Sequence, residues 1–465
     1  MIRFGTSGWR AIIAEEVTIA SVRRLADAVA GWLQSLGQAR RGVFVGHDTR
    51  FLSDRFAREA AQVLAAHRVP VTLSSGPLPT PAVAHAVLSG RRAAGVHVTA
   101  GHHPPEYSGV KIMVAGGAPA PPEVTHAIEQ LANDPANDPP ARTVRIAAPR
   151  IGDVRAAYFR QLASLIRLPA IRRARLKIAC DPRHGASTGY LDRCLAGVAR
   201  TLDVIHGTPH PEFAGEGPDC GEAQLRKLAR VVRRGRLHLG LATDGDGDRF
   251  GIIDAGGAFI PPSHFLALTA DYLLGERGMA GGVARTVATT HLLDAVCARY
   301  DRPLYETSVG FRHLAGRLVS KAACLACEES GGLGLAGHVP DKDGLLAGLL
   351  AAEMVAVRRR PLRDQIRRLL TQIGPLHNRR IDYHTEAASR DRLLRRLEDL
   401  GATFAGRRVT RVDRTDGRKM IFGDGAWILL RASDTEPLIR CSIESRTRKD
   451  LETLTAAVRE LITKG

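Results

Sequence analysis

Aromatic side chains, cysteine and long apolar runs are all scarce in this chain of 465 residues. Aromatic residues make up only 5% of the sequence, which argues against a stacking platform for single-stranded nucleic acid. The seven cysteines are an odd number scattered over a long chain, unlike a disulfide framework. No apolar run reaches the roughly 20 residues of a membrane span, and the amino terminus lacks a signal-like apolar core. The sequence therefore predicts a soluble cytoplasmic protein with no membrane partner.

Acidic residues are also fewer than basic ones. The chain has 48 aspartates and glutamates and 66 lysines and arginines, which gives a formal charge of +18. Such an excess of positive charge favours binding to nucleic acid, anionic membranes or phosphorylated small molecules, because all three carry negative charge. The basic residues are dispersed in pairs, however, and no nucleic-acid recognition module is visible. We therefore expect no specific nucleic-acid partner. The hydrophobic fraction of 44% and the charged fraction of 25% are those of an ordinary globular protein.

Three segments of the chain begin in a similar way, and this repetition indicates the fold class. Each has a β-branched run that enters a polar turn of small residues and then a helical pattern; the runs begin at Val43, Leu176 and Val283. Strands that alternate with helices at this spacing predict parallel α/β units. The last part differs, with an expected strand at 427–430 and a closing helix at about 449–463. We predict three tandem related α/β domains followed by a smaller C-terminal α+β domain.

Composition suggests where these domains end. Proline-rich patches lie between residues 115 and 150, a Gly-Gly pair stands at 256–257, and Gly374-Pro375 follows a basic helical stretch. The predicted domains are residues 1–145, 150–255, 256–372 and 375–465.

The most informative stretch is a loop in which Asp244, Asp246 and Asp248 alternate with glycines. Its flanks, 237–242 and 250–253, are apolar and short enough to be buried strands, so the acids are expected on a tight connection between two strands. Three like charges so close raise one another's pKa values unless a cation neutralises them. The loop therefore predicts a divalent-metal site, with a solvated acidic turn as the alternative.

A calcium loop of the EF-hand type is excluded by its other positions. That loop needs glycine at its sixth position and a bidentate glutamate at its twelfth, where this sequence has Arg249 and Ala255.

Four further loops carry polar groups suited to an anionic sugar. A glycine-flanked turn ends in Arg10, whose guanidinium can grip phosphate, and a histidine-bearing loop at 99–111 follows an expected strand at 93–98. An acidic glycine-rich turn at 327–332 offers a carboxylate and a hydroxyl to a sugar diol. The turn at 431–440 places an arginine, two hydroxyls and consecutive amides together, as a phosphate cradle does.

Taken in order, these loops resemble those of the α-D-phosphohexomutase superfamily, whose bacterial members include phosphoglucomutase and phosphomannomutase. The resemblance runs from Phe4 to Pro437, and shorter matches lie at 46–50, 78–81 and 306–311. It implies a four-domain, heart-shaped protein with its active site in a central cleft. It also implies an isomerase that moves phosphate between the 1- and 6-positions of a hexose without consuming ATP.

The same resemblance implies the roles of individual residues. Mg2+ on Asp244, Asp246 and Asp248 would assist phosphoryl transfer by neutralising charge. Acid–base or charge-stabilising roles near the transferred phosphate are implied for Arg10, His102, Lys111 and Arg249. Contacts to the sugar or its distal phosphate are implied for Glu328, Ser330, His338, Lys342, Arg431, Ser433 and Thr435. The expected partners are a phosphorylated hexose and, as a candidate activator, hexose 1,6-bisphosphate; the chain is expected to be a monomer or a homodimer.

The resemblance fails at the position that matters most for the usual chemistry. The family loop reads Thr-Ala-Ser-His-Asn-Pro and its serine carries the phosphate, whereas this chain has Gly101 there and His103 in place of the asparagine. Glycine has no side chain to phosphorylate, so the usual mechanism is impossible at that residue. Asp434 is a second departure, because its charge would oppose a phosphate bound in that loop.

Four explanations of Gly101 are open at this point. His102 or His103 could form a phosphoramidate, since imidazole is a competent nucleophile. The space left by the side chain could admit free phosphate or a bisphosphorylated sugar. The protein could be a non-catalytic sugar-phosphate binder that acts as a sensor or partner subunit, or Gly101 could be an engineered change. We favour phosphohexomutase activity by an altered route over a non-catalytic sugar-phosphate binder, and both over other phosphoryl chemistry. The sequence does not identify the hexose.

Overall fold

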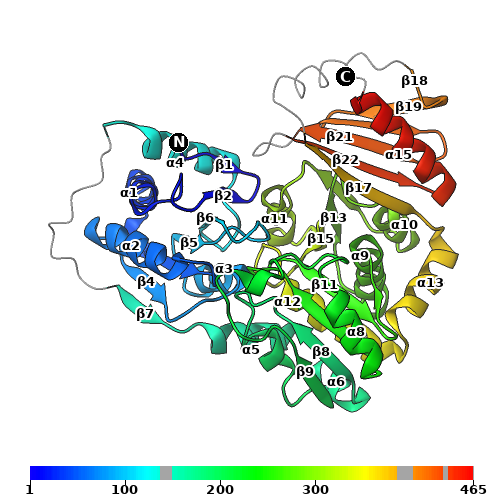
Figure 1. Cartoon of the computed structure of the whole chain (residues 1–465), viewed down its shortest axis with the longest axis horizontal. Helices are drawn as coiled ribbons and strands as arrows, with labels where there is room; N and C mark the ends of the chain where they lie inside the picture. Colours follow the sequence, from blue (N-terminus) through cyan, green and yellow to red (C-terminus); the bar gives the residue numbers. More distant parts are fainter. Residues whose placement is uncertain (137–148, 385–401, 433–437, 464–465) are drawn as a thin grey trace.

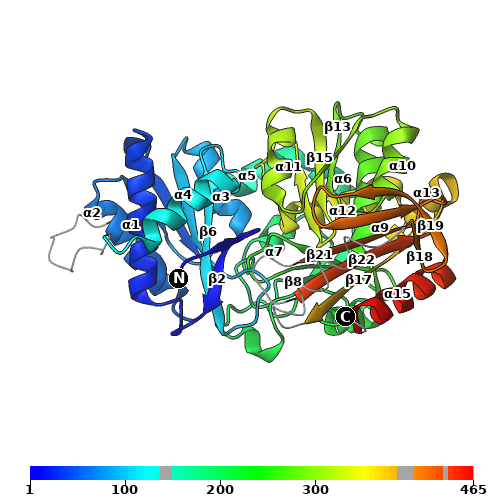
Figure 2. The same cartoon turned by 90° about the horizontal axis from the view of Figure 1, so that it is seen from above.

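The computed structural model describes residues 1–136, 149–384, 402–432 and 438–463. Within them the chain forms four sheets that follow one another in sequence. Figure 1 shows the four units arranged around an arc, from the blue first unit to the red last one. Figure 2, seen from above, places the first unit at one end and the last two at the other. The predicted order, three α/β domains and then a smaller domain, is confirmed.

The first unit is a mixed seven-stranded sheet of order β1-β2-β6-β5-β3-β4-β7. Its strand VFVGH, β3, is buried along its whole length, as expected for a parallel strand covered on both faces. The strands are β1 (Phe4–Gly5), β2 (Gly8–Ile12), β3 (Val43–His47), β4 (Val71–Ser74), β5 (Ala94–Val98), β6 (Tyr107–Val114) and β7 (Arg150–Gly152). The helices are α1 (Ile19–Ser35), η1 (Ala39–Arg41), α2 (Ser53–Ala66), α3 (Thr80–Ser89) and α4 (Pro122–Asn133).

The second unit has a five-stranded sheet of order β12-β11-β10-β8-β9, in which β8, β9 and β10 are parallel. Strands β10 and β11 form the hairpin that carries the aspartate loop. The strands are β8 (Lys177–Asp181), β9 (Thr201–Val204), β10 (Leu239–Thr243), β11 (Phe250–Asp254) and β12 (Ala258–Phe259). The helices are α5 (Arg155–Leu165), α6 (Leu168–Ala174), α7 (Leu191–Leu195), η2 (Phe213–Gly215) and α8 (Arg226–Arg234).

The third unit has a four-stranded sheet of order β14-β13-β15-β16, parallel except for the β15–β16 hairpin. That hairpin carries the acidic glycine-rich turn at its tip. The strands are β13 (Gly282–Thr286), β14 (Leu304–Thr307), β15 (Ala323–Glu328) and β16 (Gly332–Leu335). The helices are α9 (Pro262–Asp271), η3 (Tyr272–Glu276), α10 (Leu292–Arg299), α11 (Phe311–Val319), α12 (Gly344–Arg358) and α13 (Leu362–Ile373).

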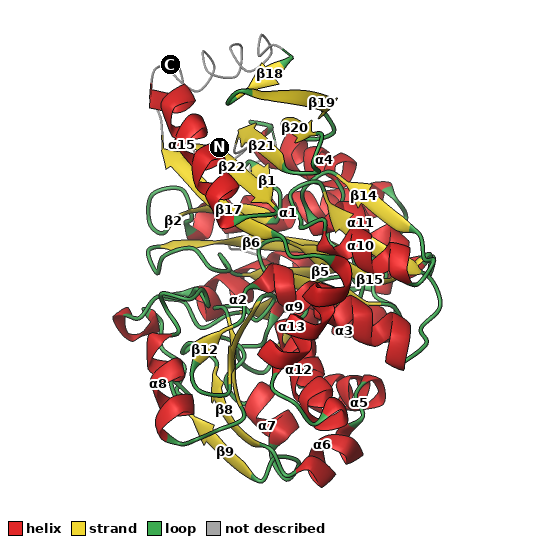
Figure 3. Cartoon of the chain, turned by 90° about the vertical axis from the view of Figure 1, so that its right-hand side faces the viewer, coloured by secondary structure: helices red, strands yellow, loops and turns green. Residues whose placement is uncertain are grey.

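The last unit is an antiparallel six-stranded sheet of order β17-β22-β21-β20-β19-β18, with one long helix packed on one face (Figure 3). This antiparallel sheet with a one-sided helix is the α+β pattern predicted for the end of the chain. The strands are β17 (His377–His384), β18 (Thr403–Phe404), β19 (Arg407–Asp413), β20 (Arg418–Phe422), β21 (Trp427–Ala432) and β22 (Leu438–Ser445), and the helix is α15 (Arg448–Thr463).

Two short strands cross the predicted domain boundaries. β7 lies at the start of the predicted second domain but pairs with β4 at the edge of the first sheet. β12 lies in the predicted third domain but pairs with β11 in the second sheet. Both are edge strands of two or three residues. Composition marks where a linker runs, but it does not reveal which sheet edge such a strand joins.

The apolar core is continuous across the first three units and separate in the fourth. One cluster combines α3 with the strands and helices of the second and third units, and another fills the far side of the first sheet. The last unit has its own cluster around Ile428 and Leu454. It meets the third unit through a small patch in which Trp427 and Leu429 contact Val287, whose carbonyl accepts a 2.7 Å hydrogen bond from Lys419 Nζ.

Glu353, on α12, is a buried charge that ties the second unit to the third. Its side chain is fully buried and forms an ion pair with Arg277 at 2.5 Å, and it accepts hydrogen bonds from Tyr272 Oη and from the backbone N–H of Arg167. Because both oxygens are satisfied, the charge is tolerated in an apolar surrounding.

Replacing Glu353 should therefore be costly. Glu353→Ala leaves the guanidinium of Arg277 without its partner, and we expect a loss of about 3–5 kcal/mol in the free energy of unfolding. Thermal and urea unfolding would measure it. The control is Glu452→Ala, which removes an exposed ion pair with Arg379 and should leave stability almost unchanged. Equal effects of the two substitutions would contradict the assignment.

Candidate functional site

The aspartate loop lies where the first three units meet. It connects β10 to β11, as predicted, and its backbone is held from three sides. The backbone N–H groups of Thr80, Ala186 and Gly344, one from each unit, donate to carbonyls of residues 245–247 at 2.8–3.0 Å. The loop is therefore fixed in place before any ligand binds.

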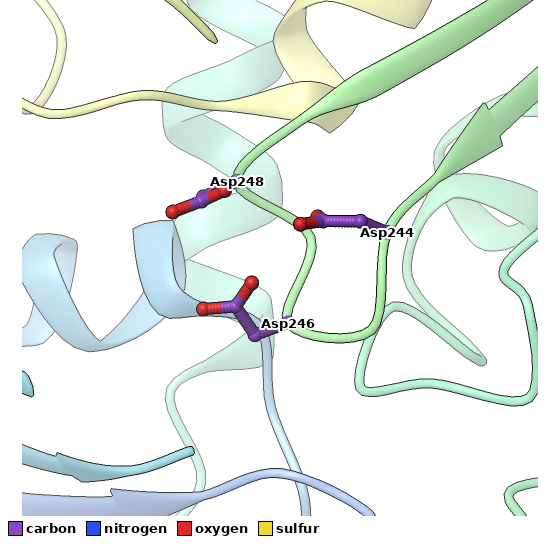
Figure 4. A group of neighbouring side chains, drawn as sticks. All are labelled: Asp244, Asp246 and Asp248. Carbon is purple, nitrogen blue, oxygen red and sulfur yellow. The ribbon is translucent and has the colours of Figure 1, made fainter. Parts of the chain in front are cut away.

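The carboxylates of Asp244, Asp246 and Asp248 are buried and point toward one another (Figure 4). One oxygen of each lies within 4.8 Å of the other two. Asp244 Oδ2 and Asp246 Oδ1 are buried and have no hydrogen-bond partner among the described residues. Unpaired buried carboxylate oxygens are costly unless a cation or a donor satisfies them, and oxygen-only sites suit hard cations such as Mg2+ and Ca2+. The residues therefore fit a divalent cation.

Burial and mutual repulsion govern the charge of the triad. Burial, reinforced by Asp248 and Asp246, raises the pKa of Asp244 well above its usual value. Burial also acts to raise the pKa of Asp248, but the positive charges of Lys111, Lys342 and Arg249 outweigh it and hold that pKa low. The three groups titrate together.

Lys111 and Thr80 fix the orientation of Asp246. Lys111 Nζ forms ion pairs with Asp246 and with Asp248, the latter at 2.7 Å. Thr80 Oγ1 donates to the same Oδ2 of Asp246 and lies 3.0 Å from His97 Nδ1. Two donors therefore occupy Oδ2 of Asp246, and Oδ1 is left for a ligand.

Gly101 lies directly beside this free oxygen. Its φ is +63°, a left-handed conformation in which a side chain is strained. A Cβ built on Gly101 would lie 3.5 Å from Asp246 Oδ1 and 3.4 Å from Arg10 Nη2. The missing side chain thus leaves a space between the aspartate triad and a guanidinium.

Arg50 holds the loop that follows Gly101. Its guanidinium is fully buried, pairs with Asp48 at 3.1 Å and lies over the ring of Phe213. The remaining N–H groups donate at 2.6–3.0 Å to four carbonyl oxygens, those of Gly101, His103, Pro104 and Tyr107. The conformation of this loop therefore depends on a buried charge and not on the side chain at position 101.

An open pocket adjoins this loop and is lined by all four units. Basic residues dominate its wall, which makes it suited to a ligand with several negative charges. The first two units contribute Gly5, Thr6, Ser7, Gly8, Arg10, His102, His103 and Arg249, and the last two contribute Val309, Glu328, Glu329, Ser330, Lys342, Arg380, Arg431 and Arg440.

The acidic turn supplies two carboxylates and a hydroxyl to the wall of the pocket. Glu328 is buried at the end of β15, accepts from the backbone N–H of Gly310 at 3.1 Å, and lies 3.5 Å from Lys342 Nζ. Burial raises the pKa of Glu328, although the positive charge of Lys342 opposes the shift. Ser330 follows at the tip of the hairpin and also lines the pocket.

The last unit supplies three arginines. Arg431 on β21 is paired in register with Arg440 on β22, and Arg380 lies on β17, the neighbouring strand. Arg431 is buried and lies 3.9 Å from Asp416. Ser433, Asp434 and Thr435, for which phosphate contacts or interference were predicted, lie outside the described residues.

His338, unlike most of the other predicted site residues that the structure describes, lies outside the pocket. Its side chain is fully buried, and its Nε2 lies 2.7 Å from Asp343 Oδ2, while the same oxygen accepts from Tyr158 Oη. Asp343 in turn caps the N-terminus of α12. His338 does not line the pocket described above, so the geometry gives it a packing contact between the second and third units.

Profiles of one family match all four units. They are described as phosphoglucomutase/phosphomannomutase domains I, II and III, each alpha/beta/alpha, and the C-terminal domain of the same proteins. They match residues 1–138, 156–257, 261–373 and 386–461 respectively.

The chain belongs to the phosphoglucomutase/phosphomannomutase family. This family lies within the α-D-phosphohexomutase superfamily of isomerases, so the resemblance stated from the sequence is confirmed.

Individual relatives are similar along their whole length. A Thermococcus kodakarensis phosphoglucomutase/phosphomannomutase is 28% identical over 96% of this chain and 95% of its own. A Pseudomonas putida phosphoglucosamine mutase is 27% identical over 99% and 98%. Among solved structures, a candidate phosphomannomutase of Thermus thermophilus superimposes with a TM-score of 0.87 at 33% identity, covering 99% of each chain.

Several residues at this candidate site were not predicted from the sequence. Arg50 and Thr80 lie in the short matches at 46–50 and 78–81, which imply no role for either residue. Arg380 was counted as one of a dispersed basic pair, and only the alternation of β17 could have placed it on one side of the sheet. Within the described ranges no helix is long and apolar enough to cross a membrane.

The role of Arg50 can be tested by a conservative substitution. Lysine keeps the charge but cannot reproduce the fork that reaches four carbonyls and Asp48. We expect Arg50→Lys to lower the free energy of unfolding by about 3 kcal/mol and to speed amide hydrogen exchange in residues 101–107. The control is Arg55→Lys, which alters a half-exposed ion pair with Glu59 on α2. If both variants exchange alike, the loop does not depend on Arg50.

Proposed function

We propose that the chain interconverts hexose 1-phosphate and hexose 6-phosphate by a route that does not use a phosphoserine. The observation that carries this proposal is the pocket, whose wall combines Arg10, which lies beside the carboxylate triad, with an acidic turn and an arginine cluster from the last unit. A hexose that carries phosphate has the charge and the hydroxyls that these groups can bind. A protein that only needed structural strength would gain nothing from three clustered buried carboxylates.

We further propose that the triad holds Mg2+. Asp244, Asp246 and Asp248 would be its protein ligands, and the ion would supply neutralisation of charge on the transferred phosphoryl group. The unpaired buried oxygens of Asp244 and Asp246 support this assignment. Lys111 and Arg10 stand beside the triad and would neutralise the remaining charge.

The rest of the pocket has the chemistry to hold a sugar in two orientations. Glu328 can accept hydrogen bonds from sugar hydroxyls, and Ser330 can donate or accept them. Both side chains could therefore bind the sugar in either of its two orientations. Arg380, Arg431 and Arg440 would bind the phosphate remote from the reaction by charge-assisted hydrogen bonds. A phosphate at the 1- or the 6-position presents the same dianion to them.

A non-catalytic sugar-phosphate binder is the second candidate, because Gly101 itself favours it. The pocket would bind the same ligands with the same residues, and only turnover would be missing. Binding and turnover must therefore be measured separately.

A coupled mutase assay beside a Gly101→Ser variant tests the proposed activity. We expect Mg2+-dependent conversion of glucose, mannose or glucosamine 1-phosphate to the 6-phosphate, stimulated by added hexose 1,6-bisphosphate. The variant should gain at least about tenfold in kcat/KM, since it restores a hydroxyl beside Asp246 and Arg10. Its gain would be limited by left-handed strain of about 1–2 kcal/mol.

Gly101→Ala is the matched control, because it adds the same Cβ and the same strain without a hydroxyl. It should not gain activity. If neither the natural protein nor Gly101→Ser turns over any of these sugars, while the ligands raise the Tm, the binder explains the site and the mutase proposal fails.

Metal binding is tested independently of turnover. Mg2+ should raise the Tm and give a calorimetric binding signal, because it satisfies buried carboxylates that are otherwise unpaired. Asp246→Asn should weaken binding by at least about tenfold, whereas Asp203→Asn, on the exposed edge strand β9, should leave it unchanged. Binding that survives Asp246→Asn would place the ion elsewhere.

A further inference from the structure

His102 is the first side chain after Gly101, and it lines the phosphate-binding pocket. Among the described residues neither of its ring nitrogens has a hydrogen-bond partner, and the ring lies among Arg249, Arg10 and His103. The side chain is only partly buried, so both ring nitrogens are open to a ligand that enters the pocket. Here an unpaired imidazole faces a pocket built for anions.

The surrounding charges favour a neutral, nucleophilic ring. Burial, together with the positive charges of Arg249 and Arg10, lowers the pKa of His102 well below its usual value. A neutral imidazole has a free electron pair at neutral pH, which is the form that attacks phosphorus. The same guanidinium groups would stabilise a phosphoryl group once it is attached.

The space for that phosphoryl group is provided by the missing side chain of Gly101. A Cβ at that position would already be 3.4 Å from Arg10 Nη2 and 3.5 Å from Asp246 Oδ1. Arg10 Nε is buried with no hydrogen-bond partner in the described part of the chain, so one donor of this guanidinium is available to an anion. A side chain at position 101 would compete with a phosphorylated neighbour for this volume.

His103 is less suited to carry a phosphate, although it lines the same pocket. Its backbone is held at both ends, because its N–H donates to the carbonyl of Ala100 and its carbonyl accepts from Arg50. Its ring stands edge-on to Tyr107 at 5.2 Å and to His102 at 5.1 Å. His103 is therefore packed between two rings and supports His102.

We propose that His102 is the phosphoryl carrier of this protein, in place of the serine that the chain lacks at position 101. The inference rests on the proposed mutase function. A ring nitrogen of His102 attacks a phosphorus of hexose 1,6-bisphosphate, so that an N–P bond forms and the sugar O–P bond breaks. The sugar oxygen leaves with the bonding electron pair and takes a proton from pocket water, which yields a hexose monophosphate.

The return step regenerates the histidine. The free 1- or 6-hydroxyl of a hexose monophosphate attacks the phosphorus and loses its proton to water. The N–P bond breaks, and its electron pair returns to the imidazole ring. Each cycle therefore consumes no phosphate, and the bisphosphate is needed to load the carrier.

Phosphohistidine can be detected directly in the unmodified protein. The purified chain is incubated with glucose 1,6-bisphosphate and Mg2+, and its intact mass and phosphorus NMR spectrum are recorded. We expect one added phosphate that is stable in alkali, is lost in acid and maps to residue 102. The label should be absent from His102→Gln and present in His103→Gln.

A rescue experiment separates a carrier from a histidine that acts only as an acid, a base or a support. His102→Gln should lower kcat by at least about a hundredfold. Adding Gly101→Ser to His102→Gln should restore part of this activity and give an acid-stable phosphate, because serine becomes the carrier. A structural or acid–base role for His102 would not be replaced by a serine at the neighbouring position.

The outcomes separate this inference from the function on which it rests. Turnover by the natural protein without an acid-labile phosphate overturns the role of His102 and leaves the mutase activity standing. A label that persists in His102→Gln also overturns it. Failure of both the natural protein and Gly101→Ser to turn over any hexose phosphate overturns the mutase function itself.

Discussion

Three buried carboxylates on one loop cannot stay ionised without nearby positive charge, and in this protein that charge comes from three different domains. Lys111 belongs to the first domain, Arg249 to the second and Lys342 to the third, and all three act on Asp248. Removing any one of them would leave charge uncompensated in a buried place. The same electrostatic requirement that prepares the loop for a cation therefore also holds the three domains in register around it, together with the shared apolar core.

The sequence allowed the aspartate hairpin to be predicted because its signal is local. Alternating acids between two short apolar runs specify a hairpin and place three carboxylates together on it. Arg50 could not be predicted in this way, because its partners are four backbone carbonyls, and any sequence supplies carbonyls. His338 is predicted to contact the ligand from a family motif; in the fold its side chain packs against Tyr158 and contacts Asp343, and its role in binding stays a prediction. Residue composition likewise did not predict which sheets the edge strands β7 and β12 join.

The loop at Gly101 is held by contacts that do not involve a side chain at position 101. Arg50 binds its carbonyls, and Thr99 Oγ1 accepts from the N–H of Gly101 at 3.0 Å while donating to Asp48. All of these contacts involve backbone or neighbouring side chains. The contacts that hold this loop therefore require no side chain at position 101, and they leave space beside Asp246 and Arg10.

The attachment of the last domain bears on the dimensions of the pocket. Its three arginines belong to one sheet, which meets the third unit through a small apolar patch and through polar contacts that include those of Lys419, Glu444 and Asp416. The remaining wall of the pocket belongs to a much larger continuous body. The placement of this one sheet therefore fixes how far its arginines lie from the rest of the pocket wall.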